Sequence, residues 1–250
     1  MILILGLTWI AAFLFAQELS VILAKPLIDA WNDHKDALGA PALHFRSLVE
    51  PFWTSMSVAF WFSVIFSAPF LFYQLWRGVT RARAPHHQNM ALPFAVATAL
   101  CFAGGALFCY FVVLPVAFDF FLGYADDNLA AMSNALGVTY KLGSPVALKP
   151  ALLLEPYLAL TMRLLLAFGL VFELPIAIFF LASIGVVTHR GLWRFNRWAV
   201  VLAFVIGAIL TPSPDVLSQV LMAGPLLVLY NLSIIVAWFL TRRRERAVAG

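Results

Sequence analysis

The stretch LALTMRLLLAFGLVFELPIAIFFLASI, residues Leu158–Ile184, decides the fold. Almost every residue in it is apolar, and a helix of this length can cross a lipid bilayer. Two charges interrupt the run, Arg163 near its start and Glu173 near its middle. A charged side chain at the centre of a membrane helix costs roughly 2.5–3.5 kcal/mol on insertion scales. Something must therefore offset that cost, such as a polar partner, a water-filled cavity or a bound helix.

Pro175 follows the carboxylate by two residues. Proline removes a backbone donor and tends to bend a helix. We interpret the buried acid Glu173 beside this bend as the chemical centre of the chain. The alternative is a neutral carboxyl group that is hydrogen-bonded within the bundle for structure alone. Arg163 lies near the other end of the run, and its side chain is expected to extend to the membrane interface.

The composition excludes an ordinary soluble domain. Of the 250 residues, 63% are hydrophobic and 11% are charged, whereas soluble domains carry about 25% charged residues. The two cysteines, Cys101 and Cys109, lie in one apolar segment and are expected to be free. We expect no metal, because metal-ligand spacing is missing, and no nucleic-acid partner, because no basic patch is interleaved with aromatics. The chain is predicted to form one all-α membrane domain over residues 1–250.

Hydropathy in a window of about 19 residues predicts six membrane-spanning helices. Their expected bounds are Ile2–Leu23, Ser55–Leu75, Leu92–Val116, Leu158–Ile184, Trp198–Leu210 and Val216–Leu240. The fifth helix is short for a hydrocarbon core of roughly 30 Å. Only Thr211–Asp215 separate it from the sixth, which predicts a tight helical hairpin. Because no basic residue precedes the first span, we expect it to be retained, with a cytoplasmic lead-in lost.

The placement of lysine and arginine predicts the orientation in the membrane. One set of loops is rich in arginine, with Arg77, Arg81, Arg83, Arg190, Arg194, Arg197, Arg242, Arg243, Arg244 and Arg246. The loops on the other side mix basic with acidic residues, among them Lys25, Asp29, Glu50, Asp126 and Glu155. The arginine-rich side is predicted to be cytoplasmic, and both termini are expected to lie there.

Several stretches resemble the TatC family, the multi-spanning component of the twin-arginine protein translocase. They are Val49–Phe52, Ser67–Pro69, Tyr73–Trp76, Tyr110–Pro115, Glu155–Leu158, Ala167–Pro175 and Thr211–Gln219. Each is a weak pattern by itself. Together they follow the family's order over about Glu18–Leu240, and the predicted number of spans and orientation also match.

The resemblance implies a concave, glove-like bundle of six helices with no enzymatic activity and no cofactor. It implies a Sec-independent translocase subunit in the bacterial inner membrane, acting in a hetero-oligomer of several copies with single-span TatA/TatB-type partners. Such a subunit binds twin-arginine signal peptides, and the complex exports folded proteins using the proton-motive force. By the same resemblance, Glu173, Thr211 and Gln219 form an intramembrane polar site where a partner helix docks. A polar group in lipid gives such docking both position and specificity.

Two peripheral regions complete the prediction. Prolines and aromatic residues in the first outer loop suggest an ordered cap near the membrane face, and Glu50, Pro51 and Phe52 are expected to order it. The loop between the second and third spans is the expected signal-peptide loop, where the family uses acids that accept charge-assisted hydrogen bonds from arginine. Here residues 77–89 contain three arginines and no acid, with His87 about where the family has a glutamate. For His86 and His87 the alternatives are a pH-sensitive contact, a metal site or a solvated loop.

Two alternative functions remain open. A divergent TatC paralogue would keep the scaffold and the partner helices but recognise another signal, and the acid-free loop favours this alternative. A proton-coupled small-solute transporter would use Glu173 as a proton site. The missing internal repeats and the missing second intramembrane acid argue against a transporter. A membrane enzyme is disfavoured because the spans contain no His/Asp cluster and no Ser–His pair.

Overall fold

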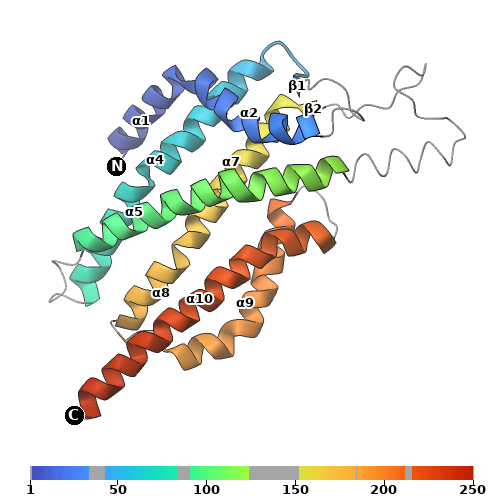
Figure 1. The fold of residues 1–250 in the computed structure, drawn as a ribbon. Helices are drawn as coiled ribbons and strands as arrows, with labels where there is room; N and C mark the ends of the chain where they lie inside the picture. The colour runs from blue at the N-terminus through green and yellow to red at the C-terminus, as the bar shows by residue number, and fades with distance from the viewer. Residues whose placement is uncertain are drawn as a thin grey trace, which may run out of the picture. The chain divides into compact units, whose positions relative to one another are not determined.

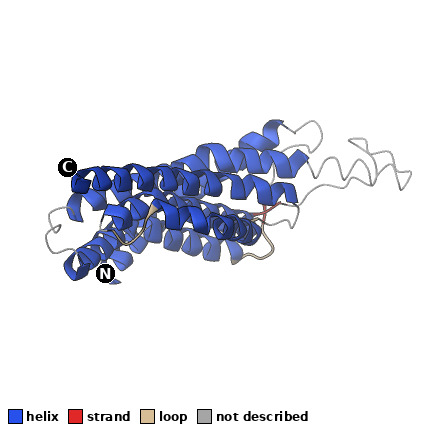
Figure 2. Cartoon of the chain, turned by 90° about the horizontal axis from the view of Figure 1, so that it is seen from below, coloured by secondary structure: helices blue, strands red, loops and turns tan. Residues whose placement is uncertain are grey.

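The computed structural model describes residues 2–33, 43–83, 91–123, 152–183, 185–211 and 216–249, and nearly all of these are helical (Figure 2). The two strands in this part of the chain are short. Strand β1 (Leu43–His44) pairs in parallel with β2 (Leu152–Leu153), with Leu43 opposite Leu152. The predicted all-α fold class is confirmed.

The helices follow one another along the chain as Figure 1 shows. They are α1 (Ile2–Leu14), α2 (Ala16–Asp33), α4 (Glu50–Arg83), α5 (Ala91–Phe108), a π-helical turn (Cys109–Val113), α7 (Leu154–Phe172), α8 (Leu174–Ser183), α9 (His189–Leu210) and α10 (Val216–Ala249). Within the described residues, five helical segments are long and apolar enough to cross a membrane. The bent pair α1–α2 makes a sixth if it is one span.

The structure corrects two of the expected boundaries and adds a bend to the first span. Helix α9 begins at His189 and has 22 residues, so the predicted fifth span was too short. Its first turns carry arginines that lower the local hydropathy without interrupting the helix. Helix α2 continues to Asp33, into the stretch expected to be the first outer loop. The expected first span is also bent by 74° between α1 and α2.

The chain divides into two compact units by its internal contacts. The first unit consists of Met1–Leu5, Val64–Cys109 and Arg163–Gly250 and contains α8, α9 and α10. The second unit consists of Gly6–Ser63 and Tyr110–Met162 and contains α2 and the two strands. Helices α1, α4 and α7 contribute residues to both units.

In the second unit, two tyrosines accommodate the proline inside α2. Pro26 has no N–H, so the carbonyl of Ile22, four residues earlier, lacks its usual helical donor. The Tyr110 hydroxyl donates to this carbonyl over 2.8 Å. The Tyr157 hydroxyl donates to the next carbonyl, that of Leu23, over 2.6 Å. These side-chain donors explain why α2 continues past its proline, since freed backbone groups in a membrane protein must find other partners.

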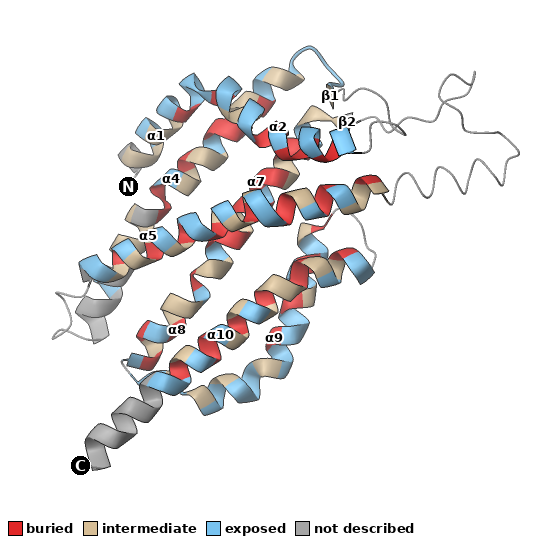
Figure 3. Ribbon diagram, viewed as in Figure 1, coloured by how far each residue is buried: buried red, intermediate tan, exposed pale blue. Residues whose placement is uncertain are grey.

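In the first unit, α10 packs against both α8 and α9. Buried residues recur along α10 while other positions remain exposed (Figure 3). One small core joins α8 to α10 and consists of Ile178, Ala182 and Ala237. A second joins α9 to α10 and consists of Ala199, Tyr230 and Ile234. Alanine allows the helix backbones to approach closely, as is typical of helix packing in membranes.

Helices α5 and α7 also approach closely in the first unit, at two glycines. A Cβ atom on Gly105 of α5 would lie 2.6 Å from the Phe168 carbonyl oxygen of α7. A Cβ atom on Gly169 of α7 would lie 2.7 Å from the ring of Phe102 in α5. A larger side chain at Gly105 would push the two helices apart because it would meet backbone, whereas at Gly169 the Phe102 ring would have to move. This crossing lies a few residues before the end of α7.

Candidate functional site

Glu173 is the turn residue at which α7 ends and α8 begins. Its N–H donates to the Leu170 carbonyl over 3.1 Å. This bond spans three residues and makes a tighter turn than the four-residue hydrogen bond of an α-helix. Its own carbonyl accepts from the Ala177 N–H over 2.9 Å, so α8 begins normally. Pro175 is the second residue of α8. In the first turn of a helix the missing N–H costs no hydrogen bond, and the fixed φ of proline suits the conformation.

The Glu173 side chain is turned into the protein. The residue is 8% exposed. Its Oε1 atom is buried and has no hydrogen-bond partner within the described residues. Arg163, the other charge in the same span, is exposed. An unpaired buried carboxyl oxygen loses the hydrogen bonds that water would give it, so an additional donor at this position would be stabilising.

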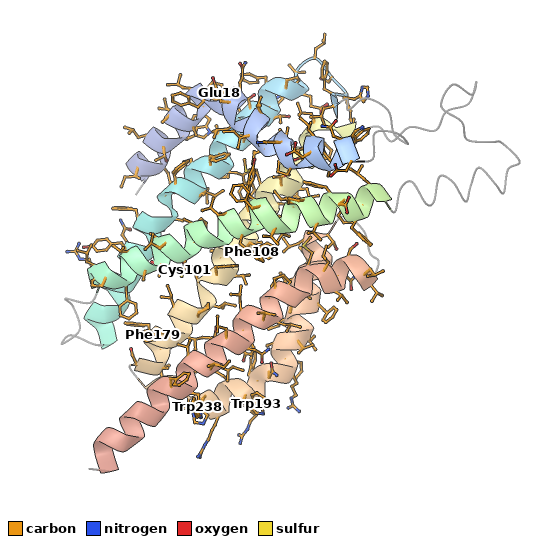
Figure 4. All side chains as sticks on the ribbon, viewed as in Figure 1. Glu18, Cys101, Phe108, Phe179, Trp193 and Trp238 are labelled. Carbon is orange, nitrogen blue, oxygen red and sulfur yellow. The ribbon has the colours of Figure 1, made fainter. Side chains whose placement is uncertain are left out.

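The α5 side of the break consists of closely packed apolar groups. The ring of Phe172, the residue before Glu173, lies 5.4 Å from that of Phe108, measured between centroids. The carboxyl group lies beside α5, next to Cys101 and the backbone of Phe102. Figure 4 labels Cys101 and Phe108 along this helix. Together with the close approach at Gly105, these contacts form a support that fixes the end of α7.

Thr211 and Gln219 lie at the hairpin between α9 and α10. Thr211 follows the last residue of α9, and its N–H donates to the Gly207 carbonyl over 2.9 Å. It is 9% exposed, whereas Gln219 is half-buried. A Cβ atom on Gly207 would lie 3.2 Å from the Gln219 carbonyl oxygen. The backbone of Gln219 is therefore held against the last turn of α9, one turn before Thr211.

Thr211 and Gln219 lie at the same hairpin, and no contact within the described residues joins Glu173 to either of them. All three residues belong to the first unit. Helix α8, which follows Glu173, packs against α10, which carries Gln219. The predicted polar site therefore consists of two parts, a buried carboxyl group and a hairpin end, that share α10 as a support.

The expected outer cap forms the start of α4 in the second unit. The Glu50 carboxylate accepts a hydrogen bond from the Arg46 N–H, and the Glu50 N–H donates to the Ser47 carbonyl over 3.1 Å. A carboxylate in the first turn also interacts favourably with the helix dipole. The Pro51 carbonyl accepts from the Ser55 hydroxyl over 2.9 Å. The ring of Phe52 meets that of Phe13 edge-on, with centroids 6.4 Å apart. These contacts tie the start of α4 to the loop before it and to the end of α1.

His86 and His87 lie outside the residues that the structure describes. Within the described ranges, no three His, Cys, Asp or Glu side chains come close enough to hold a metal ion. Sequence reasoning missed Gly105 and Gly169, whose contacts support the break at Glu173. Glycines in an apolar run were the available signal, because small residues often lie where membrane helices meet.

Comparison with known proteins agrees with this arrangement. A family model described as Sec-independent protein translocase protein (TatC) matches residues 1–225. The Sec-independent protein translocase protein TatC of Aquifex aeolicus (strain VF5) is 35% identical over 94% of this chain and 87% of its own length. The protein of the same name from Campylobacter jejuni is 38% identical over 91% of this chain and 83% of its own length.

A solved structure is also similar. The crystal structure titled Twin Arginine Translocase Receptor- TatC is 33% identical in sequence and superposes with a TM-score of 0.78, covering 96% of this chain and 94% of that one. Family, fold and membrane-spanning helices therefore agree. The chain is a multi-pass membrane protein that belongs to the TatC family of Sec-independent protein translocase proteins.

Proposed function

We propose that this chain is the scaffold subunit of a twin-arginine translocase in a bacterial inner membrane, with both termini in the cytoplasm. It binds the signal peptides of folded precursors and the single transmembrane helices of TatA/TatB-type partners, in a hetero-oligomer of several copies. Its role is binding rather than catalysis, and the proton-motive force drives export. Membership of the family and the arginine-rich ends of the helices support this proposal.

The observation that carries the proposal is the buried Oε1 atom of Glu173, which has no partner in the described part of the chain. A partner helix with a polar side chain would supply the missing hydrogen bond. Hydrogen bonds between helices in membranes contribute about 0.6–2 kcal/mol. That energy suffices to select one docking position on the scaffold.

Thr211 and Gln219 are proposed as the second polar contact for partner helices. Both lie at the end of the α9–α10 hairpin, where Leu217 beside them is 68% exposed. An incoming helix would pack on the apolar side chains and hydrogen-bond to the polar pair. Glu50, Pro51 and Phe52 are proposed to hold the outer cap in place by the contacts at the start of α4.

Signal specificity divides the proposal into two versions. Residues 77–89 contain three arginines and no acid, and like charges repel a ligand with paired arginines. This observation favours a divergent paralogue that keeps the scaffold but recognises another signal. In the standard version, groups other than acidic side chains of this loop recognise the twin arginines. His86 and His87 are the candidates within the loop.

Export of a folded reporter tests the proposal. The reporter carries a twin-arginine signal, and the host cells have their own TatC replaced by this chain, by its Glu173→Ala variant or by a Glu18→Ala control that removes an exposed acid from α2. Export by the wild type and the control, but not by Glu173→Ala, supports the standard version. Normal insertion and partner binding without export support the paralogue. Export that is equal in all three strains contradicts the role of Glu173.

A further inference from the structure

The first half of α9 has an exposed surface that the proposed translocase function does not use. It begins HRGLWRFNRW at His189. Trp193 and Trp198 are 66% and 55% exposed. Exposed tryptophans at the end of a membrane span are typical of the interface between hydrocarbon and headgroups. This end of α9 therefore lies at the level of the lipid headgroups.

An apolar groove of about 370 Å³ lies between this end of α9 and α10. It is lined by His189, Trp193, Ile234, Ile235, Trp238 and Phe239. Trp193 and Trp238 lie on these two neighbouring helices in Figure 4. Ile235 and Phe239 are 51% and 58% exposed, so the groove is open toward the membrane. A groove of this kind accepts a hydrocarbon chain rather than a polar ligand.

Arginines border the groove on the α9 side. Arg190, Arg194 and Arg197 follow the helical repeat and form one exposed stripe. At 100° per residue, Trp193 lies about 40° from His189 around the helix, and Arg197 and Arg190 follow at about 80° and 100°. Around the circumference of α9, the face buried in the core is therefore followed by the apolar groove and then by the positively charged stripe. Within the described residues, none of the three arginines forms a salt bridge.

We infer that this groove, together with Arg190 and Arg194, is a binding site for an anionic phospholipid, with an acyl chain in the groove and the headgroup phosphate on the arginines. Charge complementarity selects the anionic headgroup, and the apolar lining selects the chain. Basic pockets between membrane helices on the cytoplasmic side are suited to such headgroups. A peptide with paired arginines would be repelled by the same stripe, so it is not the occupant.

The polar edge of the groove fits the glycerol region of such a lipid. The Nδ1 atom of His189 is buried and has no hydrogen-bond partner in the described part of the chain. His189 lies at the start of α9, next to the Thr188 hydroxyl, which accepts a hydrogen bond from the Gly191 N–H over 3.3 Å. A hydroxyl group of the lipid at this edge would donate to the imidazole nitrogen.

Quenching of tryptophan fluorescence by brominated lipids tests this inference, because two tryptophans line the groove. The full chain is reconstituted in phosphatidylcholine vesicles that contain a small fraction of either dibrominated phosphatidylglycerol or dibrominated phosphatidylcholine. We expect stronger quenching by the anionic lipid, and we expect Trp193→Phe to remove most of that excess. Soluble glycerol 3-phosphate is expected to have no effect, because it has no acyl chain.

Charge variants make the test specific to this site. Arg190→Gln/Arg194→Gln is expected to lower the preference for the anionic lipid by about fivefold per arginine. The control Arg163→Gln removes an exposed arginine from α7, away from the groove, and is expected to leave the preference within twofold. Both arginines in the test variant are exposed, so the fold should be retained.

Three results would overturn the inference. The first is equal quenching of the wild type by the two lipids. The second is an equal loss of preference in the test variant and the control, which would mean that only the general positive charge attracts the lipid. The third is displacement of the brominated lipid by glycerol 3-phosphate, which would make the site one for free phosphate.

Discussion

The α7–α8 segment and α10 are two apolar spans that each contain a proline, yet only one of them is interrupted. Pro175 follows a break at Glu173, whereas α10 continues through Pro225 without interruption. A proline alone therefore does not decide where a span breaks. The broken span has a buried carboxyl group at the interruption, and the continuous span does not.

The difference indicates separate roles for the two spans. Helix α10 packs along both α8 and α9, so it is the continuous support of the first unit. At Glu173 the chain instead has a turn residue whose carboxyl oxygen lacks a partner in the described residues. A position that both interrupts the backbone and leaves a polar group unpaired is suited to binding something else.

The largest effect on stability is expected where α5 supports the break. In Gly105→Ala the new Cβ atom would lie 2.6 Å from a backbone oxygen of α7, which cannot move aside as a side chain could. We expect a loss of about 1–3 kcal/mol, as for other overpacked sites. Unfolding in detergent, followed by helicity, measures it.

The adjacent glycine provides the control for this prediction. A Cβ atom on Gly104 would meet nothing within 4 Å. Gly104→Ala should therefore be neutral or stabilising by up to about 1 kcal/mol, since alanine favours helix. Equal stability of the two variants would contradict the close approach of α5 and α7.

The two prolines are expected to respond differently to replacement. Pro225 lies inside α10, where the Leu221 carbonyl lacks its helical donor, so Pro225→Ala should stabilise by about 1–2 kcal/mol. Pro175 lies in the first turn of α8, where the donor is not needed, so Pro175→Ala should change stability by less than about 1 kcal/mol. Unfolding of both variants under the same conditions makes the comparison. A larger gain from Pro175→Ala would reverse our interpretation of the break.

A smaller effect is expected from the hydrogen bond that joins α10 to α9. The Tyr230 hydroxyl donates to the Leu192 carbonyl over 2.9 Å. Tyr230→Phe keeps the ring in the core and removes only this bond, so we expect a loss of about 0.6 kcal/mol, the average for such bonds in a membrane protein. Export of the reporter should not change. A loss of export without a loss of stability would show that α10 does more than support.

The sequence predicted the features that depend on composition and on single residues. The apolar runs indicated membrane spans, and Pro175 indicated a bend near Glu173, although the interruption itself lies at Glu173 and was not predicted. The start of α9 was missed because Arg190 and Arg194 lower the average hydropathy, although they occupy one exposed face of the helix. The extent of α2 was missed because the donors that compensate for Pro26 come from Tyr110 and Tyr157, which are distant in the sequence.

The candidate site was predicted less completely than the fold. The burial of Glu173 could be expected from its place in an apolar run, but its missing hydrogen-bond partner is a property of the packed structure. The close approaches at Gly105, Gly169 and Gly207 depend on which helices meet, and that information is not in any local pattern. The same holds for the groove beside Trp193, which forms only because α10 lies next to α9.

The central claim is that the Glu173 carboxyl group provides the hydrogen bond by which a partner helix docks. Quantitative co-purification of a TatA/TatB-type partner with the wild type, Glu173→Gln, Glu173→Ala and the Glu18→Ala control tests it most directly. We expect Glu173→Ala to weaken association about three- to thirtyfold, from the energy of such bonds. The glutamine variant should lose less, because its amide still forms hydrogen bonds, and the control should lose nothing. Full partner retention by Glu173→Ala, with the protein normally inserted, would contradict the account.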